Sequence, residues 1–241
     1  AQFIIGLGAA ACFGPLIADI SLWFRRRRGI AVAITASGNY LSGAIWPILL
    51  APVLAGQGWR FVYTGLALAL VVTMVPLAML LRRRLAATSM TAEAQKSPFA
   101  PRAVPWSPHA LMWLLALAGL GCCMAMSMPQ VHIVAFCVDL GYGPAVGAEM
   151  LALMLAGGVV SRVVSGMVAD RLGGVVTLLI GSVLQAVALF LYLPFDGLAS
   201  LYIVSMVFGL AQGGIVPAYA IIVREYLPAR EAGRRIGVII T

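Results

Sequence analysis

The segment AVGAEMLALMLAGGVVSRVVSGMVADRLGG, residues 145–174, is an apolar run with one charge far from its ends, followed by a polar turn. About 20 apolar residues cross a bilayer core of about 30 Å, and the run 145–168 is longer than that. Arg162 is the internal charge, and Asp170 and Arg171 lie in the turn. The segment therefore predicts a transmembrane helix that contains one buried cation.

The composition of the whole 241-residue chain extends this pattern. Hydrophobic residues make up 62% of it, only 10% are charged, and the mean hydropathy is +1.02. A water-soluble fold has roughly a quarter of its residues charged, so this chain must face lipid. We expect an all-α polytopic membrane protein with seven spans, and the start of an eighth near Ile236. The spans lie near residues 2–23, 30–54, 60–81, 109–136, 145–168, 175–194 and 199–222. Both ends of the sequence fall inside apolar runs, which is typical of a fragment with an incomplete helical bundle.

Basic residues orient the spans, because lysine and arginine collect in cytoplasmic loops. Fourteen of the sixteen basic residues fall on one face of the membrane, whereas the opposite face receives only Arg60. We therefore expect a multi-pass protein of the plasma (inner) membrane with its basic loops in the cytoplasm. The fourteen are Arg25–Arg28, Arg82–Arg84, Lys96, Arg102, Arg171, Arg224, Arg230, Arg234 and Arg235.

Several functional classes are excluded by the same residues. The net charge of +8 is spread over short loop clusters, with neither a basic stripe nor a nucleic-acid motif, so no nucleic-acid partner is expected. The four cysteines lack the spacing of metal ligands, so no metal is expected. No span pairs a nucleophile with a base, so we expect neither an enzyme nor a cofactor.

The longest polar segment is RRRLAATSMTAEAQKSPFAPRAVPWS, residues 82–107. It is rich in alanine, serine and proline, which indicates a flexible cytoplasmic linker. Three of the expected spans precede this linker and four follow it. Gly29 and Gly237 each follow a basic turn and precede an apolar run. The distance along the chain between these two glycines is about that expected between matching positions of two related six-span halves. Such a duplication is known in transporters.

The turn GMVADRLGG, residues 166–174, resembles the G-x-x-x-D-R-x-G loop of the major facilitator superfamily. The segment 23–63, WFRRRRGIAVAITASGNYLSGAIWPILLAPVLAGQGWRFVY, resembles helices four to six of monocarboxylate-transporter-like and oxalate–formate-antiporter-like members. Residues 157–174 and 209–237 resemble their eighth and tenth helices. The resemblance implies that 1–81 is the second part of an N-terminal six-helix bundle (helices four to six). Residues 82–107 are then a cytoplasmic linker, and 108–241 a C-terminal bundle with helices seven to ten and the start of eleven.

Within the loop, Gly166, Asp170, Arg171 and Gly173 match the family motif, which implies a conformational role. Asp170 is expected to cap the next helix by accepting from its free N–H groups, and the glycines permit a tight turn. Basic residues usually follow in this loop, but here Gly174 follows Gly173.

Arg162 is the first candidate for substrate binding, because a buried charge in a membrane is costly and usually functional. Its planar fork is suited to donate two hydrogen bonds to a carboxylate. The alternatives are a structural arginine bonded to backbone carbonyls and one that extends to the cytoplasmic interface. In the monocarboxylate branch an Asp precedes this arginine by four residues, and here that position is Gly158, which together with Gly166 leaves space around the guanidinium.

Four further polar residues inside spans are candidates for substrate binding: Asn39, Tyr40, His132 and Gln212. Asn39 and Tyr40 fall on a helix that faces the central cavity in the family, and Gln212 lies in a glycine-rich run. Each suits a substrate contact, and each equally suits one interhelical hydrogen bond. His132 is a candidate proton carrier because it is a histidine, although a lone histidine near an interface is more often structural.

The resemblance and the buried arginine together predict a secondary transporter of small organic anions, monocarboxylates first, working by alternating access. A proton or an exchanged anion would be its co-substrate. Two alternatives stay open from the sequence. One is an exporter of a neutral solute or drug in which Arg162 is structural, and the other is a membrane sensor that transports nothing.

Overall fold

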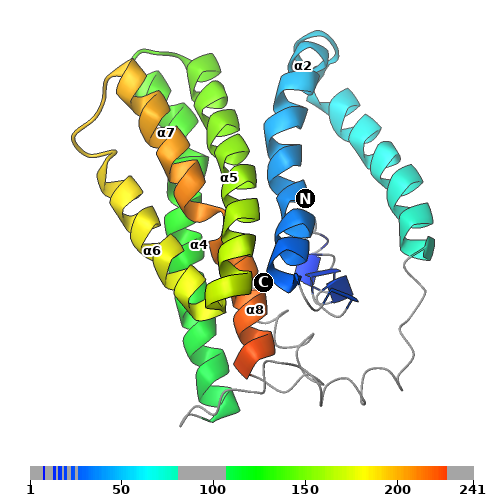
Figure 1. Cartoon of the computed structure of the whole chain (residues 1–241). Coiled ribbons are helices and arrows are strands. Elements are labelled where there is room, and N and C mark those ends of the chain that lie inside the picture. Colours follow the sequence, from blue (N-terminus) through cyan, green and yellow to red (C-terminus); the bar gives the residue numbers. More distant parts are fainter. Residues whose placement is uncertain are drawn as a thin grey trace. The chain divides into compact units, whose positions relative to one another are not determined.

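The computed structural model describes residues 8, 13–14, 16–17, 19–20, 23–24, 27–80 and 107–226. All of its regular elements are helices, shown in Figure 1. They are α2 (Arg28–Leu80), α4 (Pro108–Asp139), α5 (Pro144–Leu172), α6 (Gly174–Phe190), α7 (Leu198–Gln212) and α8 (Ile215–Tyr226). The chain divides into two compact units, one of Ala1–Ala44 with Pro101–Thr241 and the other of Ile45–Ala100.

Four helical segments of the described chain are long and apolar enough to cross a bilayer: Gly56–Leu80, Pro108–Asp139, Pro144–Leu172 and Leu198–Val223. They agree with four of the expected spans. The expected span 30–54 is helical as the first part of α2 but is not one of the four. The expected span 2–23 and the start near Ile236 lie almost wholly outside the described residues.

Glycine residues end helices at positions where polar turns were expected from the sequence. Gly58 has φ 78° and ψ 168°, which divides α2 into two helical parts at the expected turn. Gly173 has φ 86°, a conformation that side chains with a Cβ rarely adopt, and it separates α5 from α6. The helix α6 ends at Phe190 rather than near 194, because Pro194 restricts the residue before it and cannot continue the hydrogen-bonding pattern.

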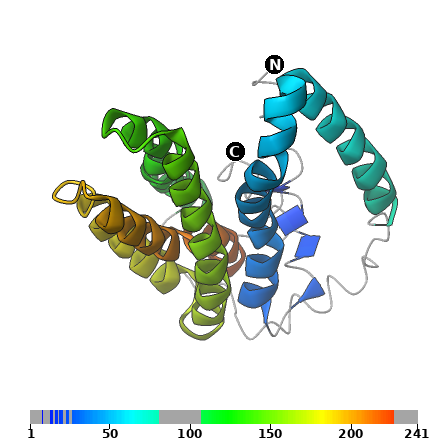
Figure 2. The same cartoon turned by 90° about the horizontal axis from the view of Figure 1, so that it is seen from above.

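The helices α4 to α8 pack into one bundle, in which α5 contacts α4 and α7 while α6 contacts α7 and α8 (Figure 2). Small residues let the backbones of α5 and α7 meet. A Cβ on Gly209 would lie 2.2 Å from the carbonyl oxygen of Met154, and one on Gly157 would lie 3.1 Å from the sulfur of Met206. The glycines of both helices therefore permit close packing of α5 against α7.

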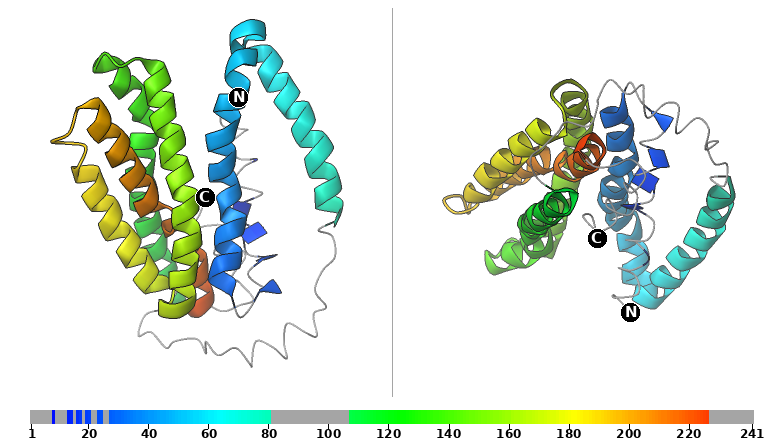
Figure 3. Two further views of the ribbon diagram at one scale, coloured as in Figure 1. Left: turned by 45° about the horizontal axis from the view of Figure 1, so that its top comes forward. Right: turned by 90° about the horizontal axis from the view of Figure 1, so that it is seen from below.

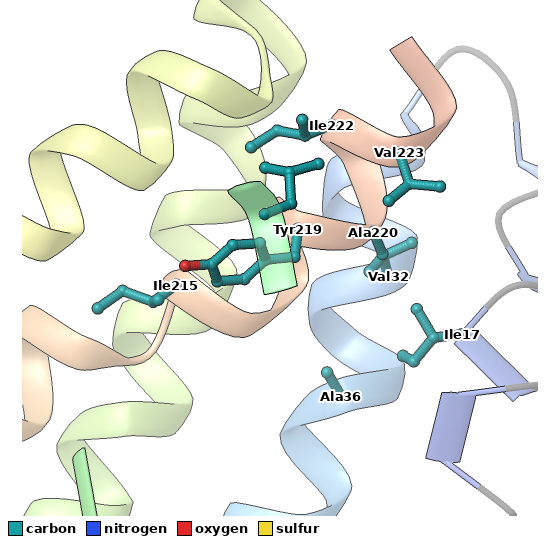
Figure 4. Close-up of a cluster of buried hydrophobic side chains, with 9 residues drawn as sticks. Ile17, Val32, Ala36, Ile215, Tyr219, Ala220, Ile222 and Val223 are labelled. Atoms are coloured by element: carbon teal, nitrogen blue, oxygen red, sulfur yellow. The ribbon is translucent and has the colours of Figure 1, made fainter. Parts of the chain in front are cut away.

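Two apolar clusters lie along this bundle. One joins α8 to the start of α2 and to α4, close to the end of α5 (Figures 3 and 4). It contains Ile17, Val32, Ala36, Leu115, Ile215, Tyr219, Ala220, Ile222 and Val223. The other joins α4, α5, α6 and α7 and contains Ile133, Cys137, Met150, Met154, Ala188, Leu201, Phe208 and Ala211.

Large apolar side chains also cover the outside of the helices. On α4 they follow helical spacing, with Trp113, Leu117, Leu120 and Met124 all exposed. A surface of this kind would promote aggregation in water, whereas lipid tails are as apolar as leucine and solvate it. The exposed face of α4 therefore agrees with a helix that lies in a bilayer.

Candidate functional site

Arg162 lies inside α5, well away from both of its ends, and only 1% of its surface is exposed. A buried cation is unfavourable unless hydrogen bonds and opposite charge compensate for the water it has lost. Its surroundings within the described chain therefore indicate what the residue does.

Three oxygen atoms accept hydrogen bonds from the guanidinium group. Nε donates to the carbonyl of Gly213 over 3.2 Å, and Nη1 donates to Oδ1 of Asn39 over 2.6 Å. Nη1 also donates to the carbonyl of Ala36. The arginine therefore connects α5 with α2 and with the break between α7 and α8.

The Gly213 carbonyl is free to accept because of a proline four residues later. In a continuous helix it would accept from the N–H of residue 217, but Pro217 has no N–H to donate. Within the expected span 199–222 the helix is interrupted at Gly213 and Gly214. The interruption results from Pro217 together with the two glycines, and it turns a backbone carbonyl toward Arg162.

The ring of Tyr40 covers one face of the guanidinium, with Cζ of Arg162 3.6 Å from the ring centroid. Such a cation–π contact is worth about 2 kcal/mol when both groups are desolvated. A Cβ at Gly158 would lie 2.4 Å from Cδ2 and 2.5 Å from Cε2 of that ring. The space that Gly158 was expected to leave beside the arginine is thus occupied by Tyr40.

All of these partners are neutral. Among the described residues, no carboxylate forms an ion pair with Arg162, and Nη2 donates no hydrogen bond. Described acidic residues such as Asp139 and Asp170 lie at helix ends instead. The positive charge of a fully buried arginine is therefore not balanced within this part of the chain.

Gln212 lies next to this group and is completely buried. Its Oε1 accepts a hydrogen bond of 2.9 Å from Nε2 of Gln130 on α4. The sequence pointed to Gln212 and not to Gln130, because no local pattern tells which two glutamines on different helices will meet. Arg162, Asn39, Tyr40, Gln130 and Gln212 thus form one polar group, the arginine cluster, in which four helices take part.

His132 is not a member of the arginine cluster. Residues two apart on an α-helix point about 200° away from each other, so Gln130 and His132 lie on opposite faces of α4. The His132 side chain is exposed and has no hydrogen bond to the described part of the chain. Its role as a proton carrier stays a prediction.

Asp170 does cap a helix, but not the one that the sequence predicted. Its Oδ1 accepts from the N–H of Gly29 over 2.6 Å and its Oδ2 from the N–H of Ile30 over 3.2 Å, at the start of α2. Gly166 makes this approach possible, because a Cβ there would lie 2.7 Å from the carbonyl oxygen of Gly29. Arg171 is exposed in the last turn of α5, where a cation is favourable.

The N-terminus of α6 is capped by Glu225 of α8 instead. Its Oε1 and Oε2 lie 3.2 and 3.3 Å from the N–H of Gly174, which donates to them. The prediction that Asp170 caps the next helix is wrong because tertiary packing brings a second carboxylate to that position. Each of the two carboxylates therefore ties one helix start to another helix.

The Asp170 cap should be measurable in the stability of the purified protein. Replacing Asp170 by alanine removes both acceptors at the start of α2 and should lower the free energy of unfolding by about 1–2 kcal/mol. Denaturant unfolding in detergent micelles would measure it. Asp139→Ala, an exposed carboxylate at the end of α4, is the matched control and should change stability little. Equal losses in both variants would contradict the cap.

Comparisons with known proteins agree with the helical architecture. The family model of the Major Facilitator Superfamily matches residues 1–241. The agnestins efflux protein AgnL12 of Paecilomyces divaricatus is 23% identical over 99% of this chain and 54% of its own length. The MFS-type transporter pytF of Aspergillus terreus is 28% identical over 71% of this chain and 56% of its own.

A mammalian protein matches as well. Monocarboxylate transporter 13 of Bos taurus is 28% identical over 88% of this chain and 49% of its own length. The chain thus spans about half the length of the curated relatives it matches. The family match covers the whole sequence, and the helical fold of the described residues agrees with it. This chain belongs to the Major Facilitator Superfamily of membrane transporters.

Proposed function

We propose that the protein is a secondary transporter of small organic anions, with monocarboxylates as the first class to test. The observation that supports this is the buried Arg162, whose described partners are all neutral. A carboxylate beside it would supply the missing negative charge, and charge-assisted hydrogen bonds are about twice as strong as neutral ones. Among the described residues Nη2 of Arg162 has no hydrogen-bond acceptor, and we assign this guanidinium nitrogen to the anion.

Transport would follow from competition between the anion and the helices for the same donors. Nη1 of Arg162 is bonded to Asn39 and to the Ala36 carbonyl of α2, and Nε to the Gly213 carbonyl. An anion that draws the guanidinium toward itself weakens these bonds and changes the relative free energy of the two access states. Alternating access by rocking of helix bundles then carries the anion across the membrane.

Coupling to a second solute is part of the proposal. Because Gly158 stands where the monocarboxylate branch has an aspartate, we assign no proton partner next to Arg162. The co-substrate is a proton bound elsewhere or an exchanged anion. We place the protein in the plasma (inner) membrane with its basic loops in the cytoplasm, following the distribution of lysine and arginine.

The second candidate is an exporter of a neutral solute. AgnL12 is described as an efflux protein, and the described Arg162 contacts also suit a structural role in which it stabilises the Gly213 carbonyl at the helix break. In that case the substrate would make no contact that depends on its charge. Competition between charged and neutral forms of one molecule separates the two candidates.

The test is transport by the full-length protein in proteoliposomes. Labelled pyruvate, lactate, oxalate and formate should be taken up or exchanged, and unlabelled carboxylates should compete, whereas the corresponding amides should not. The carboxylate differs from its amide mainly in charge, so discrimination of about tenfold or more is expected from charge-assisted hydrogen bonds. Failure of every carboxylate to be transported or to compete would overturn the proposed function.

A further inference from the structure

Sulfur-containing side chains are concentrated at the middle of α4, where residues 122–126 read CCMAM. All five residues lie inside the helix Pro108–Asp139. Cys122 and Cys123 are free cysteines, the first half-buried and the second exposed, and Met126 is half-buried. None of these side chains belongs to the arginine cluster, so the proposed function does not account for them.

Helix geometry brings three of these side chains to one patch on the surface of α4. Successive residues turn by about 100°, so Met126 lies between Cys122 and Cys123 in a view along the helix axis. It is four residues after the first cysteine and three after the second, the two spacings at which helical side chains meet. Because a long side chain leans back over the preceding turn, the thioether of Met126 is directed toward both thiols.

Polar groups from two other helices contact the first of the two thiols. The hydroxyl of Tyr219 on α8 donates to Sγ of Cys122 over 3.4 Å, and Oγ of Ser182 on α6 lies 3.8 Å from the same sulfur. Hydrogen bonds of this outer kind orient the ligands of a metal and tune their basicity. They hold the Cys122 sulfur in place beside the other two sulfur-containing side chains.

Two thiols and one thioether favour a soft metal ion. Thiolate and thioether sulfur select Cu(I), and Ag(I) shares its charge and its softness. Zn(II) is disfavoured, because a structural zinc site takes four thiolate, imidazole or carboxylate ligands. The described residues contain no group of three such side chains that could hold a metal ion. A monovalent cation bound by one thiolate is also neutral overall, which avoids the cost of a charge inside a bilayer.

We propose that Cys122, Cys123 and Met126 form a binding site for a soft monovalent cation, Cu(I) or Ag(I), separate from the transport site at Arg162. One thiol gives up its proton to solvent and its sulfur bonds to the metal, so the step needs neither an oxidant nor a reductant. The second thiol and the thioether complete a three-coordinate site. The cysteines alone lack the spacing of metal ligands, and the methionine one turn later completes the set.

Competition with a coloured Cu(I) chelator tests the site on the purified, reduced full-length protein. The wild type should withdraw one equivalent of Cu(I) from bicinchoninate in the presence of ascorbate, and Ag(I) should displace it. Cys123→Ala and Met126→Leu each remove one ligand and should weaken Cu(I) binding at least about tenfold. Even the loss of an outer hydrogen-bond partner costs about 10–100-fold in metal affinity, so Tyr219→Phe should weaken binding about tenfold.

Two matched variants distinguish this site from other sulfur atoms of the chain. Met128→Leu replaces an exposed methionine of α4 that is neither three nor four residues from either cysteine. Cys137→Ala removes a buried thiol 3.6 Å from the sulfur of Met150. Both variants should bind Cu(I) as the wild type does.

The fold should be kept in the ligand variants, because Cys123 is exposed and leucine conserves the volume of methionine. Failure of the wild type to withdraw Cu(I) from the chelator would overturn the proposal. Equal weakening by Met126→Leu and Met128→Leu would overturn it as well. So would loss of binding in Cys137→Ala with binding kept in Cys123→Ala. None of these results bears on carboxylate transport, so the proposed function is tested independently.

Discussion

Replacing Arg162 by methionine should reduce carboxylate transport at least about 30-fold. The variant removes the buried cation that we assign to the substrate, and losing one partner of a buried charged hydrogen bond costs about 2–5 kcal/mol. Arg162→Lys keeps the charge but loses the planar fork and its bonds to Gly213 and Asn39, so transport should fall to an intermediate rate. Initial rates of uptake in proteoliposomes, normalised to reconstituted protein, measure both effects.

Stability should change much less than transport in these variants. Methionine is an unbranched apolar side chain that replaces the aliphatic part of arginine, and it removes an unbalanced buried charge at the same time as it removes hydrogen bonds. Arg60→Gln is the control for the loss of a basic residue: Arg60 is exposed and stacks over Trp59 at 4.6 Å, so its loss should leave transport unchanged. Transport by Arg162→Met at the wild-type rate would mean that this arginine is structural.

Gly209→Ala should lower the stability of the protein strongly. The added Cβ would lie 2.2, 2.9 and 3.0 Å from the carbonyl oxygen, carbonyl carbon and Cα of Met154. These are backbone atoms of α5, which cannot rotate away as a side chain does, so the two helices must separate. Overpacking of this kind costs about 3 kcal/mol or more and outweighs the gain of up to about 1 kcal/mol in helix propensity.

Denaturant unfolding of the purified protein in micelles would measure this change. Gly121→Ala on α4 is the matched control, because its Cβ would meet no described atom within 4 Å. The control should be neutral or slightly stabilising, since alanine restricts the unfolded chain more than glycine does. A Gly209→Ala protein as stable as the control would show that α5 and α7 do not pack as closely as described.

The turns and the helical class of this protein could be predicted from the sequence, because the features that specify them are local. Apolar runs of spanning length are stable only in lipid, and Gly58 and Gly173 adopt backbone angles that side chains with a Cβ rarely reach. Arg162 could be identified for the same reason, since a charge inside such a run is costly wherever it points.

The partners of these residues depended on the tertiary structure. The sequence indicated that Asp170 accepts from a helix start, yet it could not indicate that the helix begins 140 residues earlier, at Gly29 and Ile30. One signal was available and unused: Pro217 four residues after Gly213 implies a carbonyl without a helical partner. The spacing of Gly213 and Pro217 predicts the break between α7 and α8. It does not predict that Arg162 donates to the Gly213 carbonyl.

By itself, the sequence determined that this is a helical membrane protein with one deeply buried arginine. The cost of placing charge in lipid follows from composition and length alone. Only the tertiary structure decided that Tyr40 fills the space beside Gly158, that Gln130 meets Gln212, and that neutral groups surround Arg162. The physical reason is that a sequence specifies what each side chain can donate or accept, whereas helix packing selects which groups come within hydrogen-bonding distance.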